Sequence, residues 1–103
     1  MTISVAELAV PTAVSVSVSA DTLSVDLSDG RSVQVPLSWF PRLSQATEAE
    51  RREWRLIGKG EGIHWEALDE DISVESLLAG RRSSETQASL AKWLESRERQ
   101  QKN

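Results

Sequence analysis

The only histidine of the chain, His64, lies between Ile63 and Trp65 and close to two carboxylates, Glu61 and Glu66. An imidazole beside carboxylates can act as a general base with an orienting partner, or as a metal ligand. One histidine in a chain without cysteine is, however, a small ligand set for zinc. Because side chains alternate along a strand, His64 faces away from Ile63 and Trp65. We therefore predict a half-exposed strand histidine that is neither catalytic nor a metal ligand.

The carboxylates after His64 are the second group with chemical potential. Glu66, Asp69, Glu70 and Asp71 offer the oxygen ligands that Ca²⁺ and Mg²⁺ prefer. The run lacks the spacing, the central glycine and the closing glutamate of an EF-hand. Paired carboxylates for acid–base catalysis would also need a cleft, which the sequence does not support. We predict an exposed connection that binds no metal or cofactor and that contacts a protein partner instead.

Closely spaced glycines at residues 58–62, GKGEG, resemble a phosphate-binding loop only superficially. Such glycines let backbone N–H groups approach an anion. The spacing of a P-loop or of a dinucleotide-binding fingerprint is missing, and Glu61 adds negative charge to the loop. A tight turn between two short strands is the prediction.

The composition fits one soluble globular domain. The chain has 103 residues, 39% of them hydrophobic and 27% charged. The absence of cysteine excludes disulfides, thiolate metal sites and a cysteine nucleophile. The first ten residues, MTISVAELAV, carry no basic residue before their apolar positions and no long apolar run, which predicts neither a signal peptide nor a membrane span. We expect a cytoplasmic protein that does not contact a membrane.

Charge is distributed unevenly along the chain, although the net charge is only -4. Residues 61–80 hold six acidic side chains and no Lys or Arg, whereas residues 81–103 hold six basic and three acidic side chains, a net charge of +3. Arg97, Arg99 and Lys102 are the best candidates for a phosphate contact, but this charge is weak beside that of dedicated DNA-binding proteins.

Strands are predicted first along the chain. Apolar residues occupy every second position in three runs, which are Val14, Val16 and Val18; Leu23, Val25 and Leu27; and Val33, Val35 and Leu37. Ala20-Asp21 separates the first two runs, and Asp29-Gly30 predicts a two-residue hairpin turn between the last two. A three-stranded antiparallel meander follows. Two further short strands are predicted at residues 55–57 and 63–65.

Helices are predicted from their start signals. Thr47 to Glu50 forms a capping box that begins a short helix, and Ser73 can cap a helical turn that ends at Gly80. Ser84 to Gln87 is a second capping box, and the apolar positions of its helix are Leu90, Trp93 and Leu94. The predicted fold class is α+β, a small antiparallel meander packed with short helices and a C-terminal helix. We divide the chain into a leader (1–12), an α+β domain (13–82) and a C-terminal helix with its tail (83–103).

Several motifs together identify a family. The runs LSDGRSVQVPL, WFPRL, AERREWRLIGKGEGIHW and LDEDISVESLLAG closely resemble the bacterial family described as domain of unknown function 2442, over about residues 13–82. The resemblance implies an α+β domain that also occurs fused to a helix-turn-helix domain. It also implies membership of small two-gene modules of toxin-antitoxin type, and it brings no catalytic residue. The stretch after Gly80 is too short for a separate DNA-binding domain.

From these observations we predict a non-enzymatic protein-interaction module, an antitoxin-like or accessory component of a toxin-antitoxin-type system. Its partner would be a cognate toxin-like protein, and it can also form a homodimer. The expected partner-binding residues are Glu66, Asp69, Glu70, Asp71, Trp93 and Leu94. A small dimeric DNA-binding transcriptional regulator is the alternative, and an enzyme is the third. Nucleic acid would be a partner only in the regulator.

Overall fold

The computed structural model describes residues 10–101 of the chain. Its body consists of two three-stranded antiparallel sheets with short helices, which confirms the predicted α+β class. The first sheet contains β1 (Ala13–Val18), β2 (Thr22–Leu27) and β3 (Ser32–Pro36) in that order. The second contains β4 (Trp54–Ile57), β5 (Gly62–Trp65) and β6 (Glu70–Ser73) in that order. The predicted leader lies largely outside the described residues.

The predicted meander is the first sheet, with one correction. Ala13 pairs with Leu27 and Ser15 pairs with Asp26, so that Val14 is an extra residue in a β-bulge. Ala13 is therefore buried, whereas Val14 is 55% exposed. We expected Val14 on the buried face, and this was wrong because a bulge shifts the alternation by one residue.

The turn between β2 and β3 is also longer than predicted. The Gly30 N–H donates to the Leu27 carbonyl at 3.1 Å, and the Leu27 N–H donates to the Arg31 carbonyl at 2.8 Å. Ser28, Asp29 and Gly30 thus form a three-residue loop rather than a two-residue turn. Gly30 has a φ of +90°, the positive value that such a loop requires at its last position.

The second sheet contains one strand that the sequence did not predict. β4 and β5 lie where strands were expected, and a turn of 3-10 helix, η3 (Gly58–Gly60), joins them. β6 instead lies in the segment that we expected to be an exposed connection. It pairs with β5 in a register that places Ile72 opposite Ile63, and both side chains are buried. Their burial explains why this acidic segment forms a strand.

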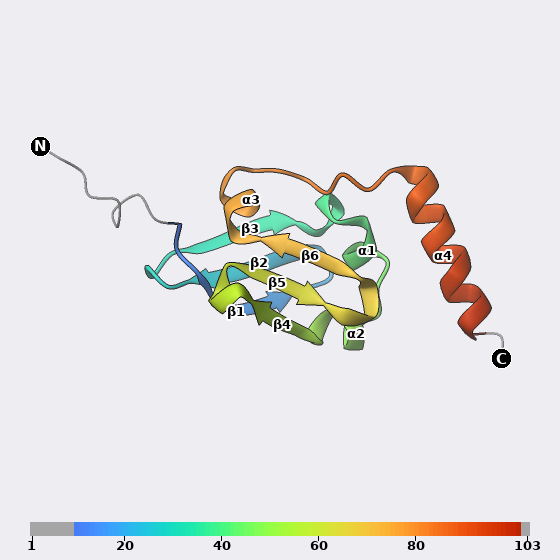
Figure 1. The fold of residues 1–103 in the computed structure, drawn as a ribbon, viewed down its shortest axis with the longest axis horizontal. Helices are drawn as coiled ribbons and strands as arrows, with labels where there is room; N and C mark the ends of the chain where they lie inside the picture. The colour runs from blue at the N-terminus through green and yellow to red at the C-terminus, as the bar shows by residue number, and fades with distance from the viewer. Residues whose placement is uncertain (1–9, 102–103) are drawn as a thin grey trace, which may run out of the picture.

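The two sheets pack face to face around one hydrophobic core (Figure 1). Trp65, Ile63 and Leu23 are fully buried in it. The indole N–H of Trp65 donates to the Arg51 carbonyl at 3.1 Å, so that its burial leaves no polar atom without a partner. Gly60 lets the first strand approach closely, because a Cβ there would lie 2.8 Å from the Ala13 carbonyl oxygen.

Three short helices close the body. They are α1 (Pro41–Ser44), α2 (Glu48–Arg52) and α3 (Val74–Leu78). The predicted capping box begins α2, and the Ser73 hydroxyl accepts a hydrogen bond from the Ser76 N–H at 3.0 Å to cap α3, so both start signals are confirmed. The 3-10 turn η2 (Leu37–Trp39) precedes α1, and η4 (Glu66–Leu68) joins β5 to β6.

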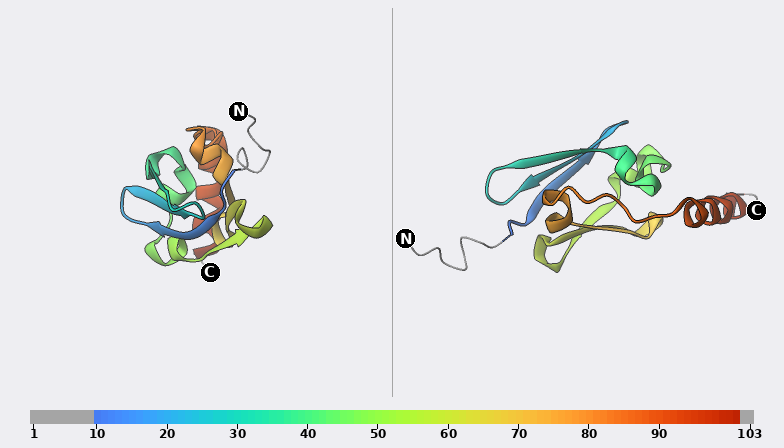
Figure 2. Two further views of the ribbon diagram at one scale, coloured as in Figure 1. Left: turned by 90° about the vertical axis from the view of Figure 1, so that its left-hand side faces the viewer. Right: turned by 90° about the horizontal axis from the view of Figure 1, so that it is seen from above.

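The C-terminal helix α4 (Gln87–Gln101) lies beyond the end of the sandwich, past α1 and α2 (Figures 1 and 2). It starts two residues later than the predicted capping box would allow, because Thr86 is the cap, with its hydroxyl accepting from the Ser89 N–H at 3.0 Å. Within residues 10–101, no helix is long and apolar enough to cross a membrane.

Candidate partner-binding face

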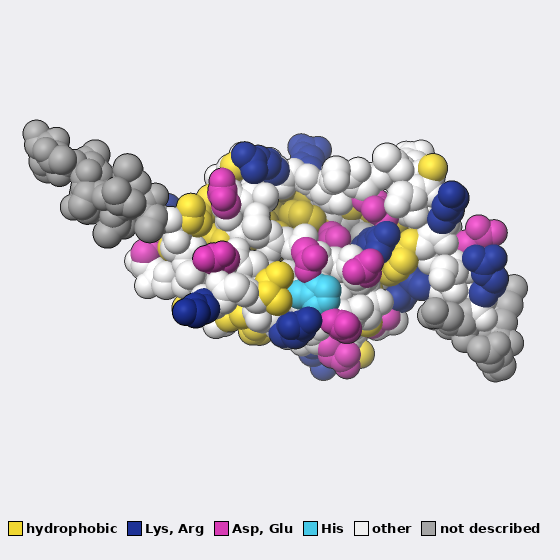
Figure 3. Space-filling model, viewed as in Figure 1, with side chains coloured by type: hydrophobic (Ala, Val, Ile, Leu, Met, Phe, Trp, Pro, Cys, Tyr) yellow, Lys and Arg dark blue, Asp and Glu magenta, His cyan; other side chains and the backbone are white. Residues whose placement is uncertain are grey.

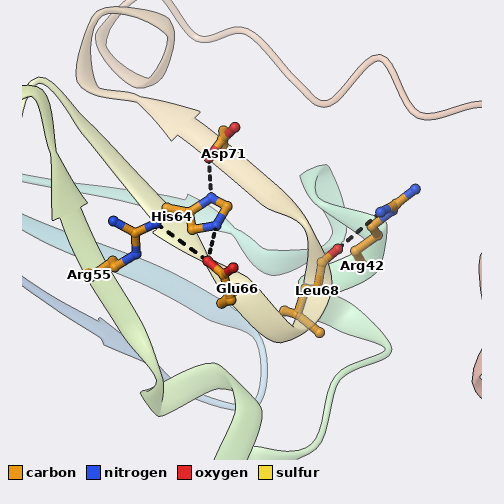
Figure 4. A network of polar contacts seen from close by, with 6 residues as sticks. All are labelled: Arg42, Arg55, His64, Glu66, Leu68 and Asp71. Carbon is orange, nitrogen blue, oxygen red and sulfur yellow. Dashed lines mark hydrogen bonds and ion pairs between the residues drawn. The ribbon is translucent and has the colours of Figure 1, made fainter.

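A row of charged side chains crosses the outer face of the second sheet, the side away from the core. Arg55 on β4 and Asp71 on β6 lie directly opposite His64 on β5 (Figure 4). Ile63 and Trp65 point inward and are fully buried, as the alternation predicted. Glu66, in η4, joins the row from the same side of the sheet. We call these four residues, Arg55, His64, Glu66 and Asp71, the charged row.

Both ring nitrogens of His64 are engaged by carboxylates. Nε2 lies 2.7 Å from a Glu66 oxygen, and Nδ1 is in hydrogen-bond contact with an oxygen of Asp71. These hydrogen bonds, the one to Asp71 first, raise the pKa of His64 above its ordinary value of 6.5. The side chain is only 15% exposed and is thus less exposed than we predicted. The sequence indicated Glu66 as a neighbour but not Asp71.

The two carboxylates themselves remain open to solvent. The side chains of Glu66 and Asp71 are 78% and 66% exposed. The pKa of Glu66 is lowered by its hydrogen bond from His64 and next by Arg55, whose guanidinium lies 3.4 Å away. Figure 3 shows acidic side chains gathered around the histidine on this face, with basic side chains among them. Among the described residues, no three metal-ligating side chains are grouped so that they could hold an ion.

The other two acidic candidates point elsewhere. Glu70 pairs with Trp65 in the sheet register and therefore lies on the inner face, where it is half-buried. Burial raises the pKa of Glu70 to about 7, although the nearby Arg42 opposes this. Asp69 adopts a left-handed conformation at the end of η4 and lines a shallow pocket against α4. The acidic run is thus divided between two sides of the sheet.

Helix α4 rests on the body through the indole ring of Trp93. The guanidinium of Arg97 lies 4.6 Å from the ring centroid, and that of Arg42 lies 5.2 Å from it. Arg97 also makes two hydrogen bonds to Glu50, of 2.7 and 2.9 Å, which lower the pKa of Glu50 to about 2. Leu94 remains half-buried beside a groove.

These contacts change the interpretation of two predicted sites. Trp93 packs against its own chain, and Arg97, proposed for phosphate contact, is engaged by Glu50. Arg42 also connects the linker before α4 to η4, since it donates to Glu85 in the linker at 2.9 Å and to the Leu68 carbonyl in η4 at 3.0 Å. Sequence reasoning missed the role of Arg42, because no local pattern connects residues so distant along the chain.

The fold and this face define a small two-sheet α+β domain with a charged outer surface. Residues 13–83 match the family described as "Protein of unknown function (DUF2442)". The chain therefore belongs to this family, which confirms the resemblance seen in its motifs.

Solved structures agree with this assignment. A crystal structure of a protein of unknown function from Rhodospirillum rubrum ATCC 11170 is 30% identical, with a TM-score of 0.62, and the match covers 78% of this chain and 96% of that one. An uncharacterised protein from Chromobacterium violaceum, solved by NMR in solution, is 29% identical with the same TM-score of 0.62, over 71% of this chain and 69% of that one. The comparison with curated proteins finds no match.

Proposed function

We propose that the protein is a non-enzymatic interaction module that presents the outer face of its second sheet to a basic protein partner. One observation carries this proposal. The Glu66 and Asp71 carboxylates stand open to solvent on a sheet face that no described helix covers (Figures 1 and 3). An uncovered face with exposed carboxylates offers charge complementarity to Lys and Arg side chains.

The state of His64 supports a binding role over a catalytic one. A general base needs a ring nitrogen that can reach the substrate, within about 3 Å. Both nitrogens of His64 are instead engaged by Glu66 and Asp71. The histidine therefore acts within the face as a hydrogen-bond donor to its neighbours.

The partner that we propose is a toxin-like protein encoded beside this one, which makes the chain an antitoxin-like or accessory component of a two-gene system. The family resemblance supports the two-gene arrangement. Charge supports the pairing, because a protein that handles nucleic acid presents a basic surface, and the exposed carboxylates of Glu66 and Asp71 can pair with its Lys and Arg side chains.

The test is co-expression of the full chain with the neighbouring gene product, followed by co-purification. Reversing two charges, Glu66→Lys with Asp71→Lys, should slow association and remove most of its salt dependence, because electrostatic steering acts on the association rate. The matched control is Asp21→Lys with Asp29→Lys, which makes the same change in net charge in the two exposed turns of the first sheet. We expect the control pair to bind like the wild type.

Equal association rates for both double variants would overturn the proposal. Co-purification of operon DNA instead of a protein would favour the dimeric regulator, if Glu66→Lys with Asp71→Lys leaves the DNA binding unchanged. In either case thermal unfolding should show both variants folded, since exposed carboxylates contribute little to stability.

A further inference from the structure

The contacts of His64 require a particular protonation state. An ionised carboxylate only accepts hydrogen bonds, so each ring nitrogen that faces one must carry a hydrogen. His64 has such a contact at both nitrogens, to Glu66 at Nε2 and to Asp71 at Nδ1. Only the imidazolium has two N–H groups, whereas the neutral ring has one. The arrangement in the structure is therefore that of a charged histidine.

The charges around His64 balance only in that state. Arg55 faces it from β4, Asp71 from β6 and Glu66 from η4. With the imidazolium, two positive and two negative charges make the charged row neutral. Loss of the proton leaves a net charge of -1 and removes the donor from one carboxylate. The released carboxylate is already at the surface, since both side chains are mostly exposed.

We propose that His64 is an internal competitor for the basic partner: as imidazolium it occupies Glu66 and Asp71, and its deprotonation releases a carboxylate that accepts a Lys or Arg side chain. This inference rests on the proposed function and adds its regulation. Because the neighbours raise the pKa of His64, the change occurs above its ordinary value of 6.5. In mildly acidic solution the carboxylates of the face are thus paired with His64. As the pH rises, one of them becomes free to bind a partner.

Competition for shared carboxylates has a reciprocal consequence. If deprotonation of His64 favours a basic ligand, that ligand must favour deprotonation of His64 by the same factor. A bound cation should therefore lower the pKa of His64. This effect can be measured without knowing the natural partner.

The experiment uses the full chain and a hexa-arginine peptide with an acetylated N-terminus and an amidated C-terminus, whose charge is constant across the pH range because arginine titrates above about pH 12. The ring nitrogens of His64 are followed by NMR as the pH rises, with and without the peptide. We expect both nitrogens to be protonated at about pH 6, and the peptide to lower the pKa of His64. Peptide affinity should rise by about two- to fivefold between about pH 6 and pH 9, the range that exposed ion pairs allow.

Two variants separate this mechanism from a general effect of charge. His64→Gln should bind the peptide more tightly than the wild type at about pH 6 and lose the part of the pH dependence that His64 causes, so that only the effect of Glu70, whose pKa is about 7, remains. Arg31→Gln is the matched control, because it also removes a positive charge that is paired with a carboxylate, Asp29 at 2.8 Å, but on the first sheet. It should keep the wild-type pH dependence.

Three results would overturn the inference. They are a neutral His64 at about pH 6, a pKa of His64 that the peptide does not change, and an equal gain in affinity from Arg31→Gln and His64→Gln. These results are distinct from failure of the proposed function. If the peptide results are negative while Glu66→Lys with Asp71→Lys still prevents partner capture, the interaction face stands and only its control by His64 is lost.

Discussion

The two sheets have the same number of strands and the same topology, but their outer faces are built differently. In the first sheet the central residue of a cross-strand row is a carboxylate, Asp26, which accepts hydrogen bonds from Ser15 at 2.7 Å and from Ser32 at 2.6 Å. In the second sheet the central residue is His64, which donates to Asp71 and to Glu66. Serine hydroxyls do not titrate near neutral pH, whereas an imidazole does. One outer face is therefore fixed and the other depends on pH.

This difference indicates where function should be sought. The Ser15–Asp26–Ser32 row satisfies its own hydrogen bonds, and these lower the pKa of Asp26, with Ser32 as the first cause and Ser15 as the second. It stabilises the pairing of three strands and leaves no group whose state changes near neutral pH. The charged row contains such a group, held between two exposed carboxylates.

The inner faces, in contrast, should behave alike, and the largest expected effect tests this. Trp65 in the second sheet and Val25 in the first are both fully buried. Trp65→Ala should lower the free energy of unfolding by about 3–5 kcal/mol, and Val25→Ala by about 2 kcal/mol, through lost burial and the cavities left behind. Urea denaturation measures both.

Val14→Ala is the control for these two core variants, because Val14 is 55% exposed. It should change the stability by less than about 0.5 kcal/mol. If Trp65→Ala is as mild as Val14→Ala, the tryptophan does not belong to the common core of the two sheets.

The sequence was sufficient for much of the fold, because local rules decide those parts. Side-chain alternation places Ile63 and Trp65 inward and His64 outward, and the capping box at Thr47 depends on neighbours only three residues apart. The bulge at Val14 was not predictable in this way. It depends on the register with β2, and a repeating Ser-Val pattern is compatible with either register.

The candidate site was predicted only in part for a similar reason. The acidic run could be seen, but its division between two faces depends on β6, whose pairing with β5 places Asp71 outward and Glu70 inward. The support of α4 was beyond sequence reasoning. Arg97 contacts Glu50 across 47 positions, and only the folded chain brings them together.

A smaller effect is expected from the one polar residue on the inner face of the second sheet. Burial raises the pKa of Glu70 from 4.5 to about 7, so the folded state holds the proton more tightly than the unfolded state. Stability should therefore fall as the pH rises from about 4.5 to about 7. The full shift corresponds to about 3 kcal/mol, which partial exposure and solvent screening reduce to about 1–2 kcal/mol.

Glu70→Gln should remove this penalty. We expect the variant to be more stable than the wild type by about 1–2 kcal/mol at about pH 8, and to show no gain at about pH 4, where Glu70 is protonated in both states. Chemical denaturation at the two pH values measures the difference. Asp26→Asn, on the outer face of the first sheet, is the control and should give no such gain. A Glu70→Gln variant that is destabilised at both pH values would contradict the assigned burial.

The smallest expected effect comes from the central residue on the outer face of each sheet, Asp26 in the first and His64 in the second. It tests directly whether one face depends on pH and the other does not. Asp26→Asn and His64→Gln should each destabilise the protein slightly at about pH 6, because each removes hydrogen bonds to two neighbours. The pKa of His64 is raised in the folded state, so its stabilisation is present below its ordinary value of 6.5 and is lost as the pH rises through the raised pKa. At about pH 9 the His64→Gln variant should therefore match the wild type more closely.

The pKa of Asp26 is lowered instead, so this carboxylate is ionised in both the folded and the unfolded state across the whole interval. The loss of stability from Asp26→Asn should therefore be the same at both pH values. Urea unfolding curves of the two variants at each pH give this comparison, and a loss for His64→Gln that does not change with pH would mean that the second sheet is as indifferent to pH as the first.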